Sequence, residues 1–219
     1  MYRILLFSSM LGLLFACGGN NTNTEANTEK DTVVKPVEVQ ELVIDSDYML
    51  DTSKTVIRWV GSKPTENHIG EVKAIRGALQ KAGDVFVDGI IQLNMNTITC
   101  EDISDESKNA KLIKHLKGED FFNVDEFPMV TLHALDMNVG EDGRLSMSSE
   151  LTIKGITERV ESDLSINEYN DTISVIGDLV FDRTLFGIKY KSVSIFPELA
   201  DKFIKDEVSI EVNAVFVKR

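Results

Sequence analysis

The feature that most constrains this chain is an alternation of apolar and polar residues that recurs from residue 47 to residue 219. A period of two is typical of strands that bury one face and expose the other, as in antiparallel sheets. Turn residues such as Gly83-Asp84 and Lys154-Gly155 separate the alternating stretches. The pattern predicts an all-β fold of about eight strands, as an up-and-down barrel or a sandwich. Closure into a barrel is favoured because it removes exposed strand edges.

Each predicted strand has one face that is mostly apolar and includes small residues. The residues predicted to share a face are Val85, Val87, Gly89, Ile91, Leu93 and Met95; Val130, Leu132 and Ala134; Leu145, Met147, Ser149, Leu151 and Ile153; Val160, Ser162, Leu164 and Ile166; Ile173, Val175, Gly177, Leu179 and Phe181; and Val208, Ile210, Val212, Ala214 and Phe216. An eight-stranded barrel is just wide enough to be filled by side chains or to hold one small ligand. A packed lumen and a cavity are both open, because small residues can also serve only to fit the taper of a barrel.

Two segments depart from the period of two. Residues 107–117 place Ala110, Ile113 and Leu116 at helical spacing, with Ser107 as the predicted N-cap and Gly118 as the predicted C-cap. Residues 196–205 show a second helical spacing of apolar residues. Both are predicted as short helices that lie across the openings of the barrel.

The segment 120–128 joins the first of these helices to a strand and carries Phe121, Phe122 and Phe127. Aromatic side chains bury large areas and contribute strongly to core stability. The segment is interpreted either as a plug that closes one end of the core or as part of the wall of an apolar ligand cavity. Buried aromatic residues more often pack than contact ligands, so the plug is the first interpretation.

The first residues predict export. Arg3 precedes an apolar stretch at residues 4–15, which is too short for a comfortable membrane span and is typical of a signal peptide. Residues 14–17 resemble the bacterial lipobox, in which the cysteine, here Cys17, becomes acylated; the alternative is an ordinary signal peptide cut near Ala16. We predict a signal peptide at residues 1–16, a lipidated and disordered tether at 17–46, and one folded domain at 47–219.

Charge and the leader together predict the surroundings of the protein. A net charge of −13 argues against binding nucleic acid and against direct binding of the domain to an anionic membrane. We expect an exported protein of the bacterial cell envelope that is lipid-anchored through Cys17 and faces the periplasm. Gly18-Gly19 does not signal retention in the inner membrane, so the outer membrane is preferred. A monomer and a homodimer are both left open.

The chain shows no pattern of catalytic residues. Its three histidines, His68, His115 and His133, have no paired metal-ligand spacing, and GxSxG and P-loop motifs are absent from the sequence. The acidic neighbours of Cys100 disfavour a thiolate. His133 is expected to point outward and His115 to lie at the edge of its helix, whereas His68 is assigned a turn hydrogen bond or a contact to a ligand head group. We therefore predict no enzyme, no cofactor and no metal.

Four stretches together resemble the YceI-like lipid/polyisoprenoid-binding family. One runs through Asp120-Phe121-Phe122 to Phe127-Pro128. The other three are Leu151-Thr152-Ile153-Lys154-Gly155-Ile156-Thr157, Arg183 with Phe186-Gly187-Ile188, and His68 upstream of Arg76-Gly77. The resemblance covers residues 47–219. It implies an extended lipocalin-like antiparallel β-barrel that binds a long apolar chain, such as an isoprenoid or a fatty amide, without catalysis.

The main hypothesis is an exported, membrane-anchored lipoprotein that binds an isoprenoid-like or fatty amide or acid ligand in the barrel lumen. The predicted wall residues are Trp59, Leu93, Phe121, Phe122, Phe127, Leu132, Leu151, Ile153, Leu164, Leu179, Phe181, Phe186 and Ile210, with His68 and Arg183 near the head group. The alternative is an interaction or stress-response lipoprotein whose lumen is filled by its own side chains and holds no ligand.

Overall fold

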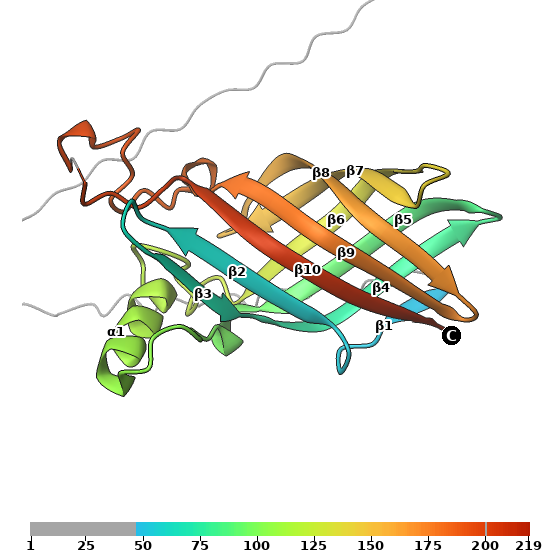
Figure 1. Ribbon diagram of the computed structural model, residues 1–219, viewed down its shortest axis with the longest axis horizontal. Helices are drawn as coiled ribbons and strands as arrows, with labels where there is room; N and C mark the ends of the chain where they lie inside the picture. Colours follow the sequence, from blue (N-terminus) through green and yellow to red (C-terminus); the bar gives the residue numbers. More distant parts are fainter. Residues whose placement is uncertain (1–46, 200) are drawn as a thin grey trace, which may run out of the picture. The chain divides into compact units, whose positions relative to one another are not determined.

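The alternating stretches form strands of one antiparallel sheet in the computed structural model, which describes residues 47–199 and 201–219 (Figure 1). The strands are β1 (Tyr48–Leu50), β2 (Val56–Ser62), β3 (Asn67–Glu71), β4 (Lys73–Ala82), β5 (Val85–Asn94), β6 (Met129–Val139), β7 (Arg144–Ile153), β8 (Ile156–Tyr169), β9 (Thr172–Asp182) and β10 (Glu207–Lys218). The predicted signal peptide and tether lie outside the described residues.

Closure of the sheet depends on the long strand β10. Its last residues pair with β1, which also pairs with β4, so β1 and β4 to β10 form a closed eight-stranded barrel. Nearer its start, β10 pairs with β2 instead, from Val208 opposite Gly61 to Asn213 opposite Val56. The β2–β3 hairpin therefore extends the wall of the barrel at one end. The predicted all-β barrel of about eight strands is confirmed.

The predicted inward faces of β7 to β10 are confirmed by burial. Leu145, Ile173 and Ala214 are 2%, 1% and 0% exposed. The prediction for the start of β5 is wrong, because Val85 and Val87 are 60% and 45% exposed whereas Phe86 is 4% exposed. The pairing of β4 with β5 shifts register at this point. A bulge adds one residue to a strand and so reverses which side chains point inward.

The turn between β7 and β8 has the two residues that the sequence predicted. Lys154 and Gly155 both adopt the left-handed conformation, with φ of 52° and 71°. Two consecutive residues with positive φ suit a tight hairpin turn whose twist matches that of the strands. A Cβ atom on Gly155 would lie 3.2 Å from the ring of Phe127, so the turn also leaves room for that ring.

One of the two predicted helices forms. It is α1 (Glu106–Lys117), whose N-cap lies two residues earlier than predicted, because Asp105, rather than Ser107, accepts a hydrogen bond from the Lys108 amide at 3.0 Å. Gly118 is the C-cap, as predicted. The described residues also form three short 3-10 turns, which are η1 (Met95–Thr97), η2 (Arg183–Phe186) and η3 (Pro197–Leu199). No helix among the described residues is long and apolar enough to cross a bilayer.

The second predicted helix, at residues 196–205, is wrong beyond its first turn. The described residues beyond that turn, 201–205, instead form an irregular segment. The Ile204 amide donates to the Lys191 carbonyl at 2.8 Å, and Ser192 and Ile204 form an isolated parallel bridge. These tertiary contacts bond the backbone groups that a helix would have paired internally.

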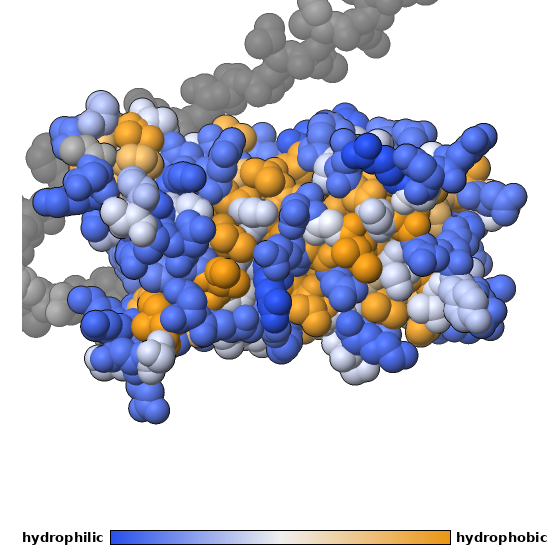
Figure 2. All heavy atoms as spheres, viewed as in Figure 1, coloured by the Kyte–Doolittle hydropathy of each residue, from blue (hydrophilic) through white to orange (hydrophobic). Residues whose placement is uncertain are grey.

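The outer surface carries apolar side chains that lie between charged ones (Figure 2). On β9, Ile176 and Val180 are 52% and 49% exposed. Between them, Asp178 lies opposite Glu211 of β10, which in turn lies opposite Arg58 of β2. A row of charges therefore crosses this face.

Candidate functional site

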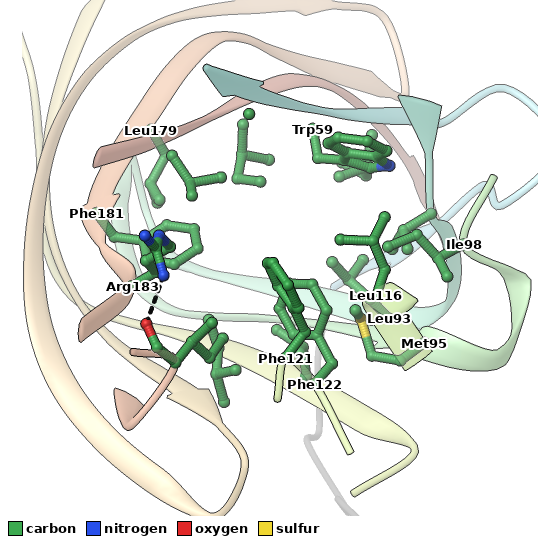
Figure 3. Close-up of a pocket in the computed structure, with 18 of the residues that line it drawn as sticks. Trp59, Leu93, Met95, Ile98, Leu116, Phe121, Phe122, Leu179, Phe181 and Arg183 are labelled. Atoms are coloured by element: carbon green, nitrogen blue, oxygen red, sulfur yellow. Dashed lines mark hydrogen bonds between the residues drawn. The ribbon is translucent and has the colours of Figure 1, made fainter. Parts of the chain in front are cut away.

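The inward faces of the strands enclose a cavity of about 160 Å³ at the end of the barrel that α1 covers. We call it the main cavity. Side chains of β2, β5, β6, β7, β9 and β10 form its wall, and α1 and the segment after it contribute Leu112, Leu116, Phe121 and Phe122. In the close-up of Figure 3, Trp59, Leu179, Phe121 and Leu116 point toward the same open space from different sides. The lumen is therefore not filled by side chains at this end.

Most of the predicted wall residues lie around this space. Those that line the main cavity are Trp59, Leu93, Phe121, Phe122, Leu132, Leu151, Ile153, Leu179, Phe181 and Ile210, together with His68 and Arg183. Leu164 lines a separate, smaller cavity farther along the lumen.

Phe127 and Phe186 line neither cavity, which corrects the prediction for these two rings. The ring of Phe127 lies against Gly155 in the turn between β7 and β8. Phe186 is completely buried and packs edge-to-face on Phe181, with 5.5 Å between the ring centroids. Both therefore support the wall from behind.

The segment after α1 turns Phe121 and Phe122 into the lumen. The Phe122 amide donates to the Leu116 carbonyl, and the Asn123 amide donates to the Gly118 carbonyl while Asn123 adopts a positive φ of 46°. This tight turn reverses the chain directly beneath the cavity. Phe121 is 7% exposed and Phe122 is half-buried, and both line the cavity. The aromatic segment is plug and wall at once, because it closes the barrel with the same rings that border the space.

Aromatic contacts hold Phe121 in this position. The ring of His115, on α1, lies edge-on to Phe121 and to Tyr190, at centroid distances of 4.9 and 4.5 Å. Edge-to-face pairs of this kind contribute stability beyond their buried area. His115 is half-buried between the two rings rather than at the solvent edge of its helix. The predicted outward position of His133 is confirmed, since its side chain is 39% exposed and its Nε2 lies 2.9 Å from Asp88.

Trp59 forms the opposite wall and is anchored by its indole nitrogen. Nε1 donates to the Thr99 carbonyl at 3.0 Å, across the backbone of Gly70. A Cβ atom at Gly70 would lie 1.8 Å from the Thr99 oxygen and 2.7 Å from Nε1. Only glycine therefore allows the segment after β5 and the indole to approach β3 this closely.

Replacing Gly70 with alanine is expected to lower the free energy of unfolding by about 2–3 kcal/mol, in the range of overpacking substitutions that force backbone shifts. The added methyl group must displace the Thr99 carbonyl and break its bond with Trp59. Urea unfolding measures the change. Gly61→Ala is the matched control, because a Cβ there meets only Trp59 ring carbons at 3.6 Å or more. Equal stability of the two variants would contradict the assigned role of Gly70.

The polar residues of the main cavity gather at one end. His68 lies opposite Gly61, Gly61 lies opposite Val208, and Val208 lies opposite Phe181, so these residues form one row across four strands. Ser62 and Lys63 come one and two residues after Gly61, and Arg183 comes two residues after Phe181; these three are the remaining polar lining residues. Lys63 Nζ is already bonded to Glu66 at 2.7 Å. The rest of the lining is apolar or glycine.

Arg183 is held by the protein itself. Its guanidinium donates to the carbonyls of Lys205, Ile188 and Ile204 at 3.0, 2.7 and 2.9 Å, and to Asp206 at 3.3 Å. These bonds use four of the five N–H groups that an arginine offers. Burial lowers the pKa of Arg183, against the opposing effect of Asp206 and Asp182. The sequence placed Arg183 near a head group; its contacts instead join the irregular segment at residues 188–206 to the end of β9.

His68 belongs to a hydrogen-bonded group with Asp102 and Cys100. His68 Nδ1 lies 2.8 Å from Asp102 Oδ2, and Asp102 Oδ1 accepts bonds from the Ile69 amide at 2.8 Å and from Cys100 Sγ at 3.3 Å. Partial burial raises the pKa of Asp102, but these bonds outweigh burial and lower it to about 2. The group fastens residues 98–102 along the outer edge of β3. There the amides of Thr99 and Glu101 also donate to the carbonyls of Glu71 and Ile69.

Possible metal ligands also meet in this group. One atom each of His68, Cys100 and Asp102 lie within 4.8 Å of one another. However, Cys100 is buried, and desolvation raises the pKa of its thiol. Asp102 already accepts hydrogen bonds from Cys100 and from the Ile69 amide. We assign the group to holding the chain.

The stability contributed by Asp102 is expected to depend on pH. Its pKa of about 2 in the folded protein lies below the 3.8 of a free aspartate side chain, so the contribution is present above about pH 4 and disappears as the pH falls toward 2. Because the side chain is 31% exposed, the loss should be only about 1 kcal/mol. Unfolding of the wild type and Asp102→Asn between about pH 6 and pH 2 tests this. Other carboxylates titrate in both proteins, so a difference between the two that stays constant with pH would contradict the assignment.

A family model described as the YceI-like domain matches residues 48–216. This chain belongs to the YceI-like family. Sequence relatives agree: the UPF0312 protein of Shewanella oneidensis is 28% identical over 93 residues, and a UPF0312 protein of Staphylococcus aureus is 29% identical over 155 residues. The Shewanella alignment covers 42% of this chain and 49% of the relative, so it spans about half the length of that protein. The Staphylococcus alignment covers 66% and 85%.

Solved structures share the YceI-like fold. Burkholderia cenocepacia BcnA has a TM-score of 0.62 at 18% identity, with 76% of this chain and 98% of that chain covered. A domain of Saccharophagus degradans, described as polyisoprenoid binding, has a TM-score of 0.60 at 16% identity, with 80% and 99% covered. At these identities the likeness shows the fold of the YceI-like domain.

Sequence reasoning missed part of the lining of the YceI-like cavity. Ile57, Val72, Ile91, Val130, Val208 and Val212 lie on strands or at their ends, and Met95, Ile98, Leu112, Leu116, Ile188 and Ile204 lie outside strands. Alternation placed Ile91, Val130, Val208 and Val212 on the predicted inward faces, together with Met95, but it did not single them out as wall residues. Ile98, Ile188 and Ile204 lie outside the alternating stretches, so periodicity gives no signal for them.

Proposed function

We propose that this YceI-like domain binds a long apolar chain, isoprenoid-like or fatty, in the main cavity without catalysing a reaction. The observation that carries the proposal is an interior cavity of about 160 Å³ whose wall is apolar except at one end. An engineered apolar cavity of about 150 Å³ is known to stay dry and to bind benzene or xenon. Space of this kind is therefore suited to hydrocarbon rather than water. The description of the Saccharophagus degradans domain as polyisoprenoid binding supports the same class of ligand.

The binding energy would come from burial. Removal of apolar surface from water contributes roughly 25 cal/mol per Å². The rings of Trp59, Phe121 and Phe181 supply large apolar areas on different sides of the cavity. The two cationic side chains of the lining, Lys63 and Arg183, are already bonded within the protein. An uncharged head group therefore suits this end better than a carboxylate or a phosphate.

Native mass spectrometry of the purified full chain tests the proposal. We expect a one-to-one adduct whose mass matches a lipid that organic extraction recovers from the same preparation. Protein without bound lipid should take up an uncharged isoprenoid probe, and unfolding should release it. A folded protein that carries no lipid and takes up no apolar probe would falsify the proposal.

The alternative, an interaction protein with a lumen filled by its own side chains, predicts no space at the centre of the barrel. The main cavity weighs against it. The exposed residues Ile176 and Val180 on β9 are separated by Asp178 and form no continuous apolar face. The sequence leaves a monomer and a homodimer both open, and sedimentation analysis of the purified protein distinguishes them.

We further propose that the domain is exported and anchored in the cell envelope, facing the periplasm, by acylation of Cys17, with the outer membrane preferred. The support is the leader sequence at residues 1–17. Two or three acyl chains would anchor the protein firmly, at about 0.8 kcal/mol per buried methylene. Labelling cells with a radioactive fatty acid should mark the wild type and leave Cys17→Ala unmarked. Equal labelling of both proteins would contradict an anchor at Cys17.

A further inference from the structure

A second cavity, of about 50 Å³, lies farther along the lumen. We call it the end cavity. The two cavities share four lining residues, Ile91, Leu132, Leu179 and Val212. Ile91 of β5 lies directly opposite Leu132 of β6, whereas Leu179 and Val212 come from the paired strands β9 and β10. Because β5 and β6 lie across the eight-stranded barrel from β9 and β10, these four side chains form a waist between the cavities.

Small residues create the space beyond the waist. Leu79, Gly89, Ala134 and Ser149 lie in register across β4 to β7, so glycine and alanine stand side by side in the wall. A Cβ atom on Gly89 would lie 3.2 Å from Leu79 and 3.5 Å from Ala134, so glycine here lets these two neighbours approach the wall. On the opposite wall Ala214 also lines the end cavity. Ala134 and Ala214 leave space in the lumen because each carries only a methyl group.

The lumen is closed beyond the end cavity. Phe86, Leu145, Ile173 and Phe216 are between 1% and 4% exposed and belong to one packed cluster. The polar lining residues Ser62, Lys63, His68 and Arg183 all lie at the other end, in the main cavity. A chain whose head group stays at the polar end can therefore extend in only one direction, through the waist and toward the closed end.

We propose that the end cavity holds the terminal segment of the bound chain and sets the longest chain that the lumen accepts. This inference rests on the proposed function. Leu and Ile side chains at the waist can exchange between staggered rotamers, so the two spaces join when a chain enters. Each methylene moved from water into apolar space strengthens binding about fourfold. The gain in affinity must stop once the chain reaches the closed end, because further methylenes either overpack the core there or stay outside the cavity at the polar end.

A homologous series of straight-chain primary alcohols, measured by displacement of a fluorescent fatty-chain probe from the full-length protein, tests the proposal. For the wild type we expect the dissociation constant to fall about fourfold per methylene and then to stop falling at one chain length, which we call the break. Ala134→Ile fills the end cavity and should move this break to shorter chains. Met137→Ala enlarges the same cavity and should move the break to longer chains. Leu135→Val, on the outward-facing neighbour of Ala134, is the matched control and should leave the break in place.

The outcomes separate the inference from the proposed function. Breaks that move in opposite directions in Ala134→Ile and Met137→Ala support the end cavity as the terminal subsite. An alcohol just longer than the break of Ala134→Ile should bind that variant at least fourfold more weakly than it binds the wild type. If all proteins bind alcohols and the break stays unmoved, the inference is wrong and the proposed function stands. If the wild type binds neither the fluorescent probe nor any alcohol, both are wrong. Should Ala134→Ile fail to fold, Met137→Ala alone still decides whether the break moves.

Discussion

Arg183→Leu is expected to lower the free energy of unfolding by about 3–5 kcal/mol, the usual cost of removing one partner of a buried ion pair. The residue is 2% exposed, and its loss removes the donor that bonds Asp206 Oδ1 and the carbonyls of Ile188 and Ile204. For a domain of this size the melting temperature should fall on the order of 10 °C. Urea and thermal unfolding measure both quantities.

Two further variants make this result specific. Arg183→Lys keeps the charge, but one ammonium cannot reproduce the planar set of donors, so most of the loss should remain. Arg159→Leu removes an arginine that is 59% exposed and paired with Asp136, and should cost about 1 kcal/mol or less. If Arg183→Leu kept full stability and lost only ligand affinity, Arg183 would be a head-group contact, as the sequence first indicated.

Phe122→Ala is expected to weaken binding of an uncharged isoprenoid probe by tenfold or more. The ring lines the main cavity, and the burial of a phenylalanine side chain contributes about 1.5–3 kcal/mol, which corresponds to at least a tenfold change in affinity. Stability should fall as well, by about 2 kcal/mol, because the ring is half-buried against the core. Probe titration and urea unfolding of the same preparation report the two effects separately.

Phe127→Ala is the matched control for this experiment. It removes the same ring from the same segment, but Phe127 lies against Gly155 and outside both cavities. It should lower stability and leave the affinity for the probe within about twofold, since no wall contact is lost. If Phe122→Ala lowered stability but left uptake intact, the aromatic segment would be a plug alone.

The alternation of apolar residues predicted most of the barrel, because the side chains of a strand point alternately to two faces whatever the strand pairs with. It failed at Val85 and Val87, where a shift in pairing between β4 and β5 reverses the faces. It also failed at residues 196–205, where apolar spacing indicated a helix but Arg183 and Lys191 bond the Ile204 backbone instead. Local patterns cannot report such partners, which lie far away or on another strand.

The candidate site likewise combines residues that local patterns predict with features that depend on distant partners. The strand positions that face the lumen, such as Leu132, Leu151 and Leu179, and the aromatic segment that closes it follow from the sequence. The space in the lumen depends on tertiary packing, because a cavity is the volume left after opposite walls have packed. Tertiary packing also decided the role of Arg183, whose acceptors come from residues 188–206. The waist depends most on the tertiary structure, because Ile91 and Val212 meet only when β5 and β10 stand on facing walls of a closed barrel.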